Sequence, residues 1–217
     1  MIGAVIAMQS EAEILLNQMQ VENTVTVCGK TVHVGKAFGK DVCLCVCGVG
    51  KVNAALGVQL IISEFHADKI LNFGVAGGLN SGTKLCEVYE IGAAVQFDFD
   101  LTQLNGTRIG TLDEYSENYL PLSPVNLFPK KNLGTSDRFN DSSADFELLT
   151  KELNADIRDM EGGAIVQGAM KANLPVYSVK AISDVAGSGS TTEQFLQNRD
   201  KALCNLSAAL ERVFKVL

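Results

Sequence analysis

Only two histidines occur among the 217 residues, and neither lies near a serine or cysteine in a nucleophilic motif. The sequence also has no G-x-S-x-G motif, which forms the nucleophile turn of many serine hydrolases. The spaced sets of His, Cys and Asp that hold zinc are absent as well. These absences argue against a serine or cysteine nucleophile and against a metal centre, and we expect no cofactor.

Basic blocks and long apolar runs are also missing. The net charge of −7 argues against a surface that binds nucleic acid or an anionic membrane. No apolar run approaches the ~18 residues that a membrane span needs. The first residues, MIGAVIAMQSEAE, have no basic region that would indicate a secretory signal. We therefore expect a cytoplasmic protein without a nucleic-acid or membrane partner.

Six cysteines are present, three of them in the alternating segment VCLCVC. Cys43, Cys45 and Cys47 would lie on one face of a strand, where neighbours two residues apart are poorly placed to form disulfides. A metal site would need further ligands, which the sequence does not cluster nearby. We expect reduced thiols that fill the core.

The size and composition of the chain fit one α/β domain that spans residues 1–217. Hydrophobic residues make up 47% and charged residues 20% of the chain, which is typical of a globular protein with a large core. Short apolar runs alternate with segments of helical period, which predicts a mixed sheet with helices. The predicted strands cover residues 2–7, 24–27, 31–37, 41–47, 69–73, 88–97, 131–135, 155–160 and 176–182, and the predicted helices cover residues 10–20, 52–65, 145–153, 161–173 and 192–217.

Residues 100–130 are rich in Asn, Gly and Pro and have no clear period. A stretch of that length without regular structure is uncommon inside a compact domain. Such stretches usually form a lid, a binding segment or an interface, and we expect one of these roles.

Two carboxylates follow predicted strands directly. Asp184 comes after the apolar run in PVYSVKAISDVAG, and Glu11 lies between the first strand and the helix that Ser10 is predicted to cap. Open α/β sheets bind ligands in the crevice outside the carboxyl ends of their strands. Both residues are therefore candidates for a site, although Glu11 could also serve only as a first-turn acid that complements the helix dipole.

Two glycine-rich segments also follow predicted strands. Gly48-Val49-Gly50-Lys51 precedes a helix, and Gly74 to Leu79 follows the strand at residues 69–73. Exposed backbone N–H groups in such turns hold anions or polar ligands, but glycines also serve tight strand–helix packing. The first segment is neither a Walker loop nor a full GxGxxG motif. Their proximity predicts a shared ligand crevice.

The polar groups at predicted strand ends are mainly carboxylates, accompanied by the aromatic Phe139. Carboxylates of this kind suit a reaction that passes through a cationic transition state and releases a protonated leaving group, which describes glycosidic bond cleavage in outline. The carboxylates are Glu11, Asp137, Asp159, Glu161 and Asp184.

Five segments carry a family resemblance: AMQSEAE, CGVGKVNAA, NFGVAGGL, DMEGGA and AISDVA, in this order between residues 7 and 186. They resemble motifs of the nucleoside phosphorylase/nucleosidase superfamily, and are most similar to those of the 5′-methylthioadenosine/S-adenosylhomocysteine nucleosidases. The resemblance implies a three-layer α/β/α sandwich that hydrolyses a purine nucleoside and releases adenine. It also implies a homodimer with the active site near the interface.

The resemblance also assigns roles to individual residues. Asp184 would donate a proton to purine N7, which requires a raised pKa, and Glu11 would activate the attacking water. Glu161 and the Met160 backbone would hold the ribose hydroxyls. Phe139 would stack on the base, Asn140 would bond its edge through the backbone, and Ser183 would orient Asp184. The implied substrate-binding set is Gly77, Phe139, Asn140, Met160, Glu161 and Ser183.

The sequence departs from the family pattern at three positions. Val75 stands where serine is expected, Lys180 where arginine is usual, and Asp159 where glutamate precedes the methionine. Residues 97–135 are also shorter than expected and lack a histidine-bearing segment. The candidates for the site of the attacking water or of an anion are Val49, Gly50, Val75 and Lys180.

Two alternatives to the hydrolysis of 5′-thio adenosine nucleosides remain open from the sequence. Hydrolysis is favoured over phosphorolysis, because the glycine turn has no arginine and Glu11 would repel phosphate. A phosphate-dependent purine nucleoside phosphorylase, or a hydrolase of another purine nucleoside, is the first alternative. An inactive nucleoside-binding regulatory module is the second, motivated by Val75 and Lys180.

Overall fold

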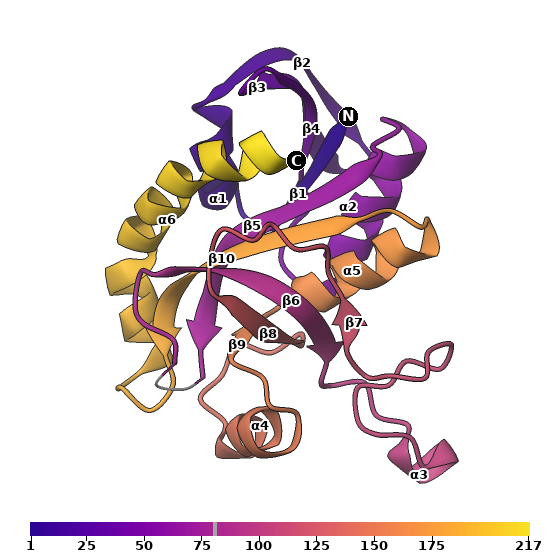
Figure 1. Ribbon diagram of the computed structural model, residues 1–217, viewed down its shortest axis with the longest axis vertical. Helices are drawn as coiled ribbons and strands as arrows, with labels where there is room; N and C mark the ends of the chain where they lie inside the picture. Colours follow the sequence, from indigo (N-terminus) through magenta and orange to yellow (C-terminus); the bar gives the residue numbers. More distant parts are fainter. Residues whose placement is uncertain (80–81) are drawn as a thin grey trace.

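The computed structural model describes residues 1–79 and 82–217, which form a large mixed sheet with helices on both faces (Figure 1). Within these residues no helix combines the length and the apolar character that crossing a membrane would require. The elements in chain order are β1 (Ile2–Ile6), α1 (Gln9–Leu16), β2 (Met19–Val27), β3 (Lys30–Ala37), β4 (Lys40–Val46), α2 (Lys51–Ser63), β5 (Lys69–Gly78), β6 (Val88–Gln96), α3 (Thr102–Asn105), β7 (Leu120–Pro121), β8 (Lys130–Thr135), α4 (Ser143–Glu147), the π-helix η1 (Leu148–Glu152), β9 (Ile157–Asp159), α5 (Gly162–Lys171), β10 (Val176–Val185) and α6 (Thr191–Val216).

The sheet consists of a closed ring of strands with an extension. Strands β5, β10, β6, β8 and β9 pair in a circle, and β1, β4, β3 and β2 continue outward from β5. The pairs β1–β4, β1–β5, β5–β10, β6–β8 and β8–β9 are parallel, whereas β2–β3, β3–β4, β5–β9 and β6–β10 are antiparallel. The predicted mixed sheet is confirmed.

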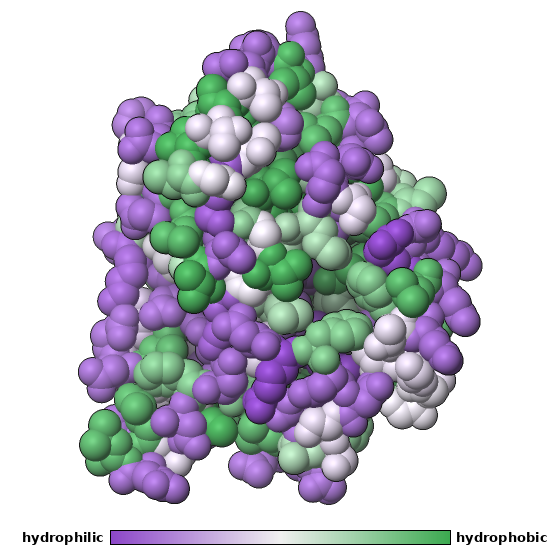
Figure 2. Space-filling view, turned by 180° about the vertical axis from the view of Figure 1, so that it is seen from behind, coloured by the Kyte–Doolittle hydropathy of each residue, from purple (hydrophilic) through white to green (hydrophobic). Residues whose placement is uncertain are grey.

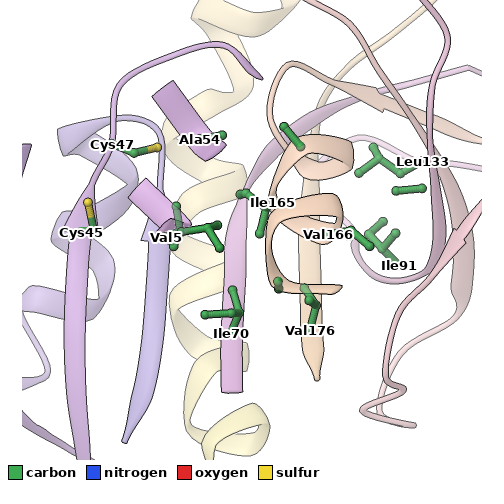
Figure 3. Close-up of a cluster of buried hydrophobic side chains, with 14 of the residues drawn as sticks. Val5, Cys45, Cys47, Ala54, Ile70, Ile91, Leu133, Ile165, Val166 and Val176 are labelled. Atoms are coloured by element: carbon green, nitrogen blue, oxygen red, sulfur yellow. The ribbon is translucent and has the colours of Figure 1, made fainter. Parts of the chain in front are cut away.

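Two hydrophobic cores lie on opposite faces of the sheet because successive strand residues point to opposite sides. In β1, Val5 packs beneath α2 and α5 with Ala54 and Ile165, as Figure 3 shows. Ile6 faces the other side, where α1 and α6 contribute Leu15 and other apolar side chains. The three-layer α/β/α sandwich is thereby confirmed. The three cysteines of the VCLCVC segment are buried free thiols, as predicted.

The first helix differs from its prediction at both ends. It begins after Met8 rather than after Ser10, and it ends at Leu16 because β2 starts at Met19. Ser10 is therefore not the N-cap. The Met8 backbone N–H donates instead to Oε2 of Glu11 (3.1 Å), so the helix terminus is capped by the acid in its own first turn.

Strands β5 and β10 extend further than their apolar runs. Both continue for several residues through the glycine and acid segments, so that Gly74, Gly77 and Asp184 lie inside strands rather than in loops. Hydrophobicity alone misses these ends because small and acidic residues have low strand propensity. The pairing register slips between Ile182 and Asp184, so Ser183 occupies a β-bulge. Bulges re-aim side chains next to functional sites.

Candidate active site

A cavity of about 510 Å³ opens at the carboxyl ends of β1, β5, β9 and β10. Parallel strands of an α/β sheet bring such ends together. The cavity gathers nine of the twelve residues to which the family resemblance gave a place in the site, whereas Gly50, Asn140 and Lys180 do not line it. The nine are Glu11, Val49, Val75, Gly77, Phe139, Met160, Glu161, Ser183 and Asp184.

Asp184 presents one unpartnered oxygen to this cavity. Its Oδ1 accepts a hydrogen bond from the Ser183 hydroxyl (2.7 Å), whereas Oδ2 is buried and has no hydrogen-bond partner among the described residues. Burial raises the pKa of Asp184, although the Ser183 hydrogen bond and the nearby Arg158 partly oppose the shift. A buried carboxyl group of this kind is suited to hold a proton and to donate it.

Glu11 is the second acid of the cavity, and it is 4% exposed. Its Oε1 accepts a hydrogen bond from the Val75 backbone (2.8 Å), and Oε2 accepts the one from Met8. Burial raises the pKa of Glu11, while the positive charge of Lys180 and these backbone hydrogen bonds oppose the shift. The backbone contacts fix the carboxylate in place, because they come from two different strand ends.

Lys180 lies beneath the cavity and balances the acids around it. Its ammonium group is 3.0 Å from Oδ2 of Asp159, and both side chains are almost fully buried. Burial opposes the charge of Lys180, but Asp159, Glu11 and Glu161 together raise its pKa above the usual value. One cation thus faces three carboxylates. Lys180 is not available to bind an anion, because it is already surrounded by acids.

Asp159 also holds the start of α5. It accepts hydrogen bonds from the hydroxyl of Thr135 (2.7 Å) and from the backbone N–H of Gly162 (3.0 Å). The ion pair of Lys180 and Asp159 therefore joins β10, β8 and the N-terminus of α5 into one rigid unit below the cavity.

Glu161 contacts the glycine turn predicted to hold a ligand. The Gly50 N–H donates to Oε1 of Glu161 (2.8 Å), and the next N–H, of Lys51, donates to Oδ1 of Asp137 (2.7 Å). Burial, and after it the charge of Asp159, raises the pKa of Glu161 to about 7. The first N–H groups of α2 are thus occupied by acids of the same chain, which leaves them closed to an added anion.

Aromatic and aliphatic side chains from α6 form a wall that the sequence did not reveal. Phe139 is 53% exposed and meets Phe195 edge to face, with ring centroids 5.9 Å apart. The helical spacing of Leu196 with Leu203, Leu206 and Leu210 predicts that all four lie in one buried stripe of the last helix, but Leu196 is 66% exposed and lines the cavity. The prediction was wrong for this residue because the start of α6 borders the cavity, whereas the apolar side chains later in the helix pack into the core.

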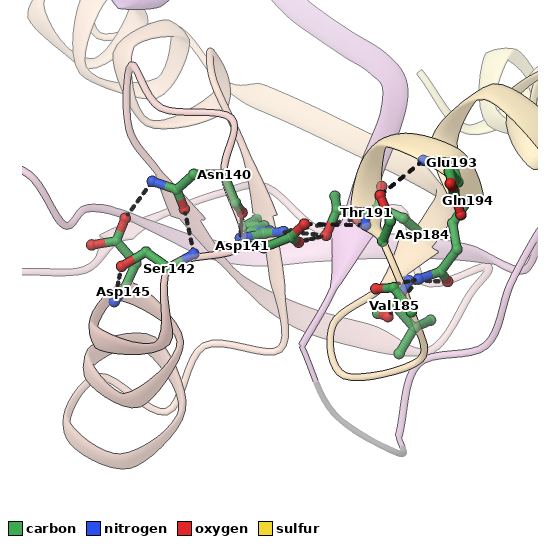
Figure 4. A network of polar contacts seen from close by, with 12 residues as sticks. Asn140, Asp141, Ser142, Asp145, Asp184, Val185, Thr191, Glu193 and Gln194 are labelled. Carbon is green, nitrogen blue, oxygen red and sulfur yellow. Dashed lines mark hydrogen bonds and ion pairs between the residues drawn. The ribbon is translucent and has the colours of Figure 1, made fainter.

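Arg158 is another cavity residue that was not identified from the sequence. Its guanidinium donates to the Asn140 carbonyl (2.7 Å) and to the Thr191 hydroxyl (3.2 Å), and it lies 4.0 Å from Oδ2 of Asp184. Asp141 also bonds the Thr191 hydroxyl, which ties the loop after Phe139 to the start of α6 (Figure 4). The one sequence feature that could have identified Arg158 is its position: it is a cationic residue at the end of a predicted strand, directly before the segment DMEGGA.

Comparisons with known proteins agree with this geometry. A family model described as the phosphorylase superfamily matches residues 1–128 and 132–215. The 5′-methylthioadenosine/S-adenosylhomocysteine nucleosidase of Halalkalibacterium halodurans is 30% identical over 225 residues, which cover 96% of each chain. The protein of that name from Staphylococcus saprophyticus is 29% identical over 232 residues and is matched along 100% of both chains.

Solved structures show the same fold. The nucleosidase of this name from Colwellia psychrerythraea, in complex with adenine, superposes with a TM-score of 0.92 at 24% identity and covers 100% of this chain and 95% of that one. The futalosine hydrolase of Helicobacter pylori also superposes with a TM-score of 0.92, at 23% identity, and the match covers 100% of this chain and 97% of that one. Because both identities are below 25%, these superpositions establish the fold alone.

Proposed function

The chain belongs to the phosphorylase superfamily, as its motifs indicated, and we propose that it hydrolyses the N-glycosidic bond of a purine nucleoside. The names of its relatives make 5′-methylthioadenosine and S-adenosylhomocysteine the first candidate substrates. The observation that carries the proposal is the buried, unpartnered Oδ2 of Asp184, which faces the same cavity as Glu11.

Asp184 acts as the general acid in this proposal. Burial raises its pKa, which favours the protonated carboxyl group, and Oδ2 donates this proton to N7 of the base. The bond between C1′ and N9 then breaks with its electron pair moving to the base, which leaves as a neutral purine. The Ser183 hydroxyl fixes the rotation of the carboxyl group through Oδ1. General acids of this kind contribute about 10²–10⁴-fold to the rate.

Glu11 accepts a proton from the attacking water, whose oxygen forms the new bond to C1′. The products are the free base and the reducing sugar, so all atoms and protons are accounted for. Lys180 supports this step because its charge favours the ionised form of Glu11. Glu161 and the Met160 backbone hold the ribose hydroxyls, and Phe139 stacks on the base.

Water is favoured over phosphate by the charges around the cavity. Glu11, Asp159 and Glu161 surround a single lysine, and the N–H groups of Gly50 and Lys51 already bind carboxylates. A phosphate dianion at this position would meet like charges and no free cation of this cluster.

The proposal is tested by incubating the protein with a panel of purine nucleosides, with and without inorganic phosphate, and separating the products by chromatography. We expect free base without phosphate. Strict phosphate dependence with ribose 1-phosphate as product would establish a phosphorylase instead. Binding of a base with no turnover across the panel would favour an inactive binding module.

The role of Asp184 is tested separately by mutation. Asp184→Asn should lower kcat/KM about 10³-fold. Asp200→Asn, at an exposed position, is the control.

A homodimer is the second part of the proposal. Val52 and Leu56 lie one turn apart on α2 and are 71% and 54% exposed, and Leu104 on α3 is 79% exposed. Hydrophobic side chains also appear among hydrophilic ones across the face that Figure 2 shows. Exposed apolar side chains grouped on one helix are typical of protein–protein interfaces.

A further inference from the structure

Arg158 and Asp184 stand side by side at one end of the cavity. Both flank Gly77: a Cβ atom at position 77 would lie 2.8 Å from Oδ2 of Asp184 and 3.2 Å from Nε of Arg158. The guanidinium and the carboxyl group therefore approach a ligand from the same strand edge, next to each other. A base protonated at N7 by Asp184 would present its adjacent C6 substituent toward Arg158.

The hydrogen-bonding character of these two groups is fixed. Arg158 can only donate, because a guanidinium has five N–H groups and no acceptor, and its bonds to Asn140 and Thr191 use two of them. Asp184 offers only Oδ2, because Oδ1 is engaged by the Ser183 hydroxyl. When Oδ2 carries the proton, this end of the cavity presents donors to both N7 and C6.

The acceptors beside Arg158 each take part in a hydrogen bond already. The Asn140 carbonyl accepts from Arg158 at 2.7 Å, and the Thr191 hydroxyl is bonded to both Arg158 and Asp141 (Figure 4). A 6-amino group is a donor and would face the guanidinium, also a donor. A 6-oxo group is an acceptor, and together with N7 it forms the pair of acceptors that arginine commonly recognises.

We propose that Arg158 selects a 6-oxopurine, such as hypoxanthine or guanine, over adenine. This inference rests on the proposed purine nucleosidase function. Within that function it replaces the first candidates, 5′-methylthioadenosine and S-adenosylhomocysteine, which carry a 6-amino group, with nucleosides that carry an oxygen at C6. The guanidinium also favours departure of the base, because negative charge that develops on O6 as the C1′–N9 bond breaks lies beside it.

The matched substrates for the test are 5′-methylthioinosine and 5′-methylthioadenosine, which differ only at C6 and the adjacent ring proton. We expect the wild-type protein to have a kcat/KM roughly 10- to 100-fold higher for the 6-oxo compound. Arg158→Met should remove most of that preference, and Arg158→Gln should move it toward the 6-amino compound, because a glutamine amide both donates and accepts. Arg212→Met is the control, since Arg212 is exposed on α6 and stacks over Phe128 away from the cavity.

The outcomes separate this inference from the function it rests on. An equal or higher kcat/KM for 5′-methylthioadenosine would overturn the inference and leave the nucleosidase proposal intact. An unchanged preference in Arg158→Met, with folding verified by circular dichroism, would also overturn the role of Arg158. If neither nucleoside is cleaved, calorimetry with the free bases decides: tighter binding of hypoxanthine than of adenine supports the inference, and the reverse order rejects it.

Discussion

Gly74 lies directly against the carboxylate of Glu11, so that a Cβ atom at position 74 would overlap Oε1 and lie 2.9 Å from Cδ of that side chain. Gly74 also pairs with Lys180 across β5 and β10. The acid and the cation thus both adjoin Gly74, the acid through its side chain and the cation through strand pairing. The absence of a side chain at residue 74 is what allows a buried glutamate to reach the cavity.

Gly74→Ala should therefore displace Glu11 without changing its chemistry. We expect kcat/KM to fall at least about 100-fold, because a displacement of roughly 1 Å can have an effect of that size. The measurement is steady-state kinetics together with a thermal melt. Gly92→Ala is the matched control, because its Cβ would meet only the flexible side chain of Lys130. Equal activities of the two variants would contradict the assigned position of Glu11.

Lys180→Met should destabilise the fold by about 3–5 kcal/mol near neutral pH, because it leaves buried carboxylates without a cation. The loss should shrink in acid, where these carboxylates can take up protons. Urea unfolding at two pH values measures both effects. Lys151→Met is the control, because Lys151 forms an exposed ion pair with Glu147. This variant should change the free energy of unfolding by less than about 1 kcal/mol. A loss from Lys180→Met that does not depend on pH would argue against the charge cluster.

Glu161 gives stability a defined pH dependence. Its pKa is about 7 in the folded protein, against an ordinary value of 4.5 for a glutamate side chain. Between these values the unfolded chain releases the proton that the folded protein keeps, so stability falls as pH rises through this window and levels off above it. Each pKa unit corresponds to about 1.4 kcal/mol.

Glu161→Gln should therefore flatten the decline in Tm across this pH window by several degrees, since 1 kcal/mol shifts Tm by roughly 2–4 °C at this size. Differential scanning calorimetry at a series of pH values is the measurement. Glu152→Gln replaces an exposed glutamate and should keep the wild-type slope. If Glu161→Gln keeps that slope as well, the carboxyl group does not hold its proton in this window.

The exposed apolar side chains of α2 predict the oligomeric state. Val52→Glu combined with Leu56→Glu should convert a dimer into a monomer, because two buried unpaired charges at an interface are costly. Light scattering after size exclusion measures the mass directly. Val216→Glu, at an exposed valine near the end of α6, should leave the mass unchanged. A wild-type protein that is already monomeric would reject the dimer.

Sequence reasoning located most of the acids but not the groups that direct them. Glu11 and Asp184 could be found because each follows an apolar strand in a recognisable motif. Arg158 and Phe195 could not, because a single arginine in a short strand and a phenylalanine in a long amphipathic helix are common surface and core residues. Only the fold brings the end of β9 and the start of α6 to the same cavity.

The elements were predicted best where hydrophobicity sets their bounds. The cysteine-bearing strand β4 follows directly from alternation. The predicted strands at residues 24–27 and 31–37 pair as the β2–β3 hairpin, but β2 begins earlier than predicted, at Met19. The ends of β5 and β10 were missed because glycines and an aspartate continue these strands. Pairing with neighbouring strands holds them in place, and the local sequence does not encode that pairing.

The most direct test of the proposed chemistry compares a good nucleoside substrate with its 7-deaza analogue, which has carbon in place of N7. Protonation of N7 by Asp184 predicts that the analogue binds as a competitive inhibitor and is cleaved at least about 10³-fold more slowly. Cleavage of the 7-deaza compound at a rate close to that of the parent nucleoside would contradict the role of Asp184 as the acid that releases the base.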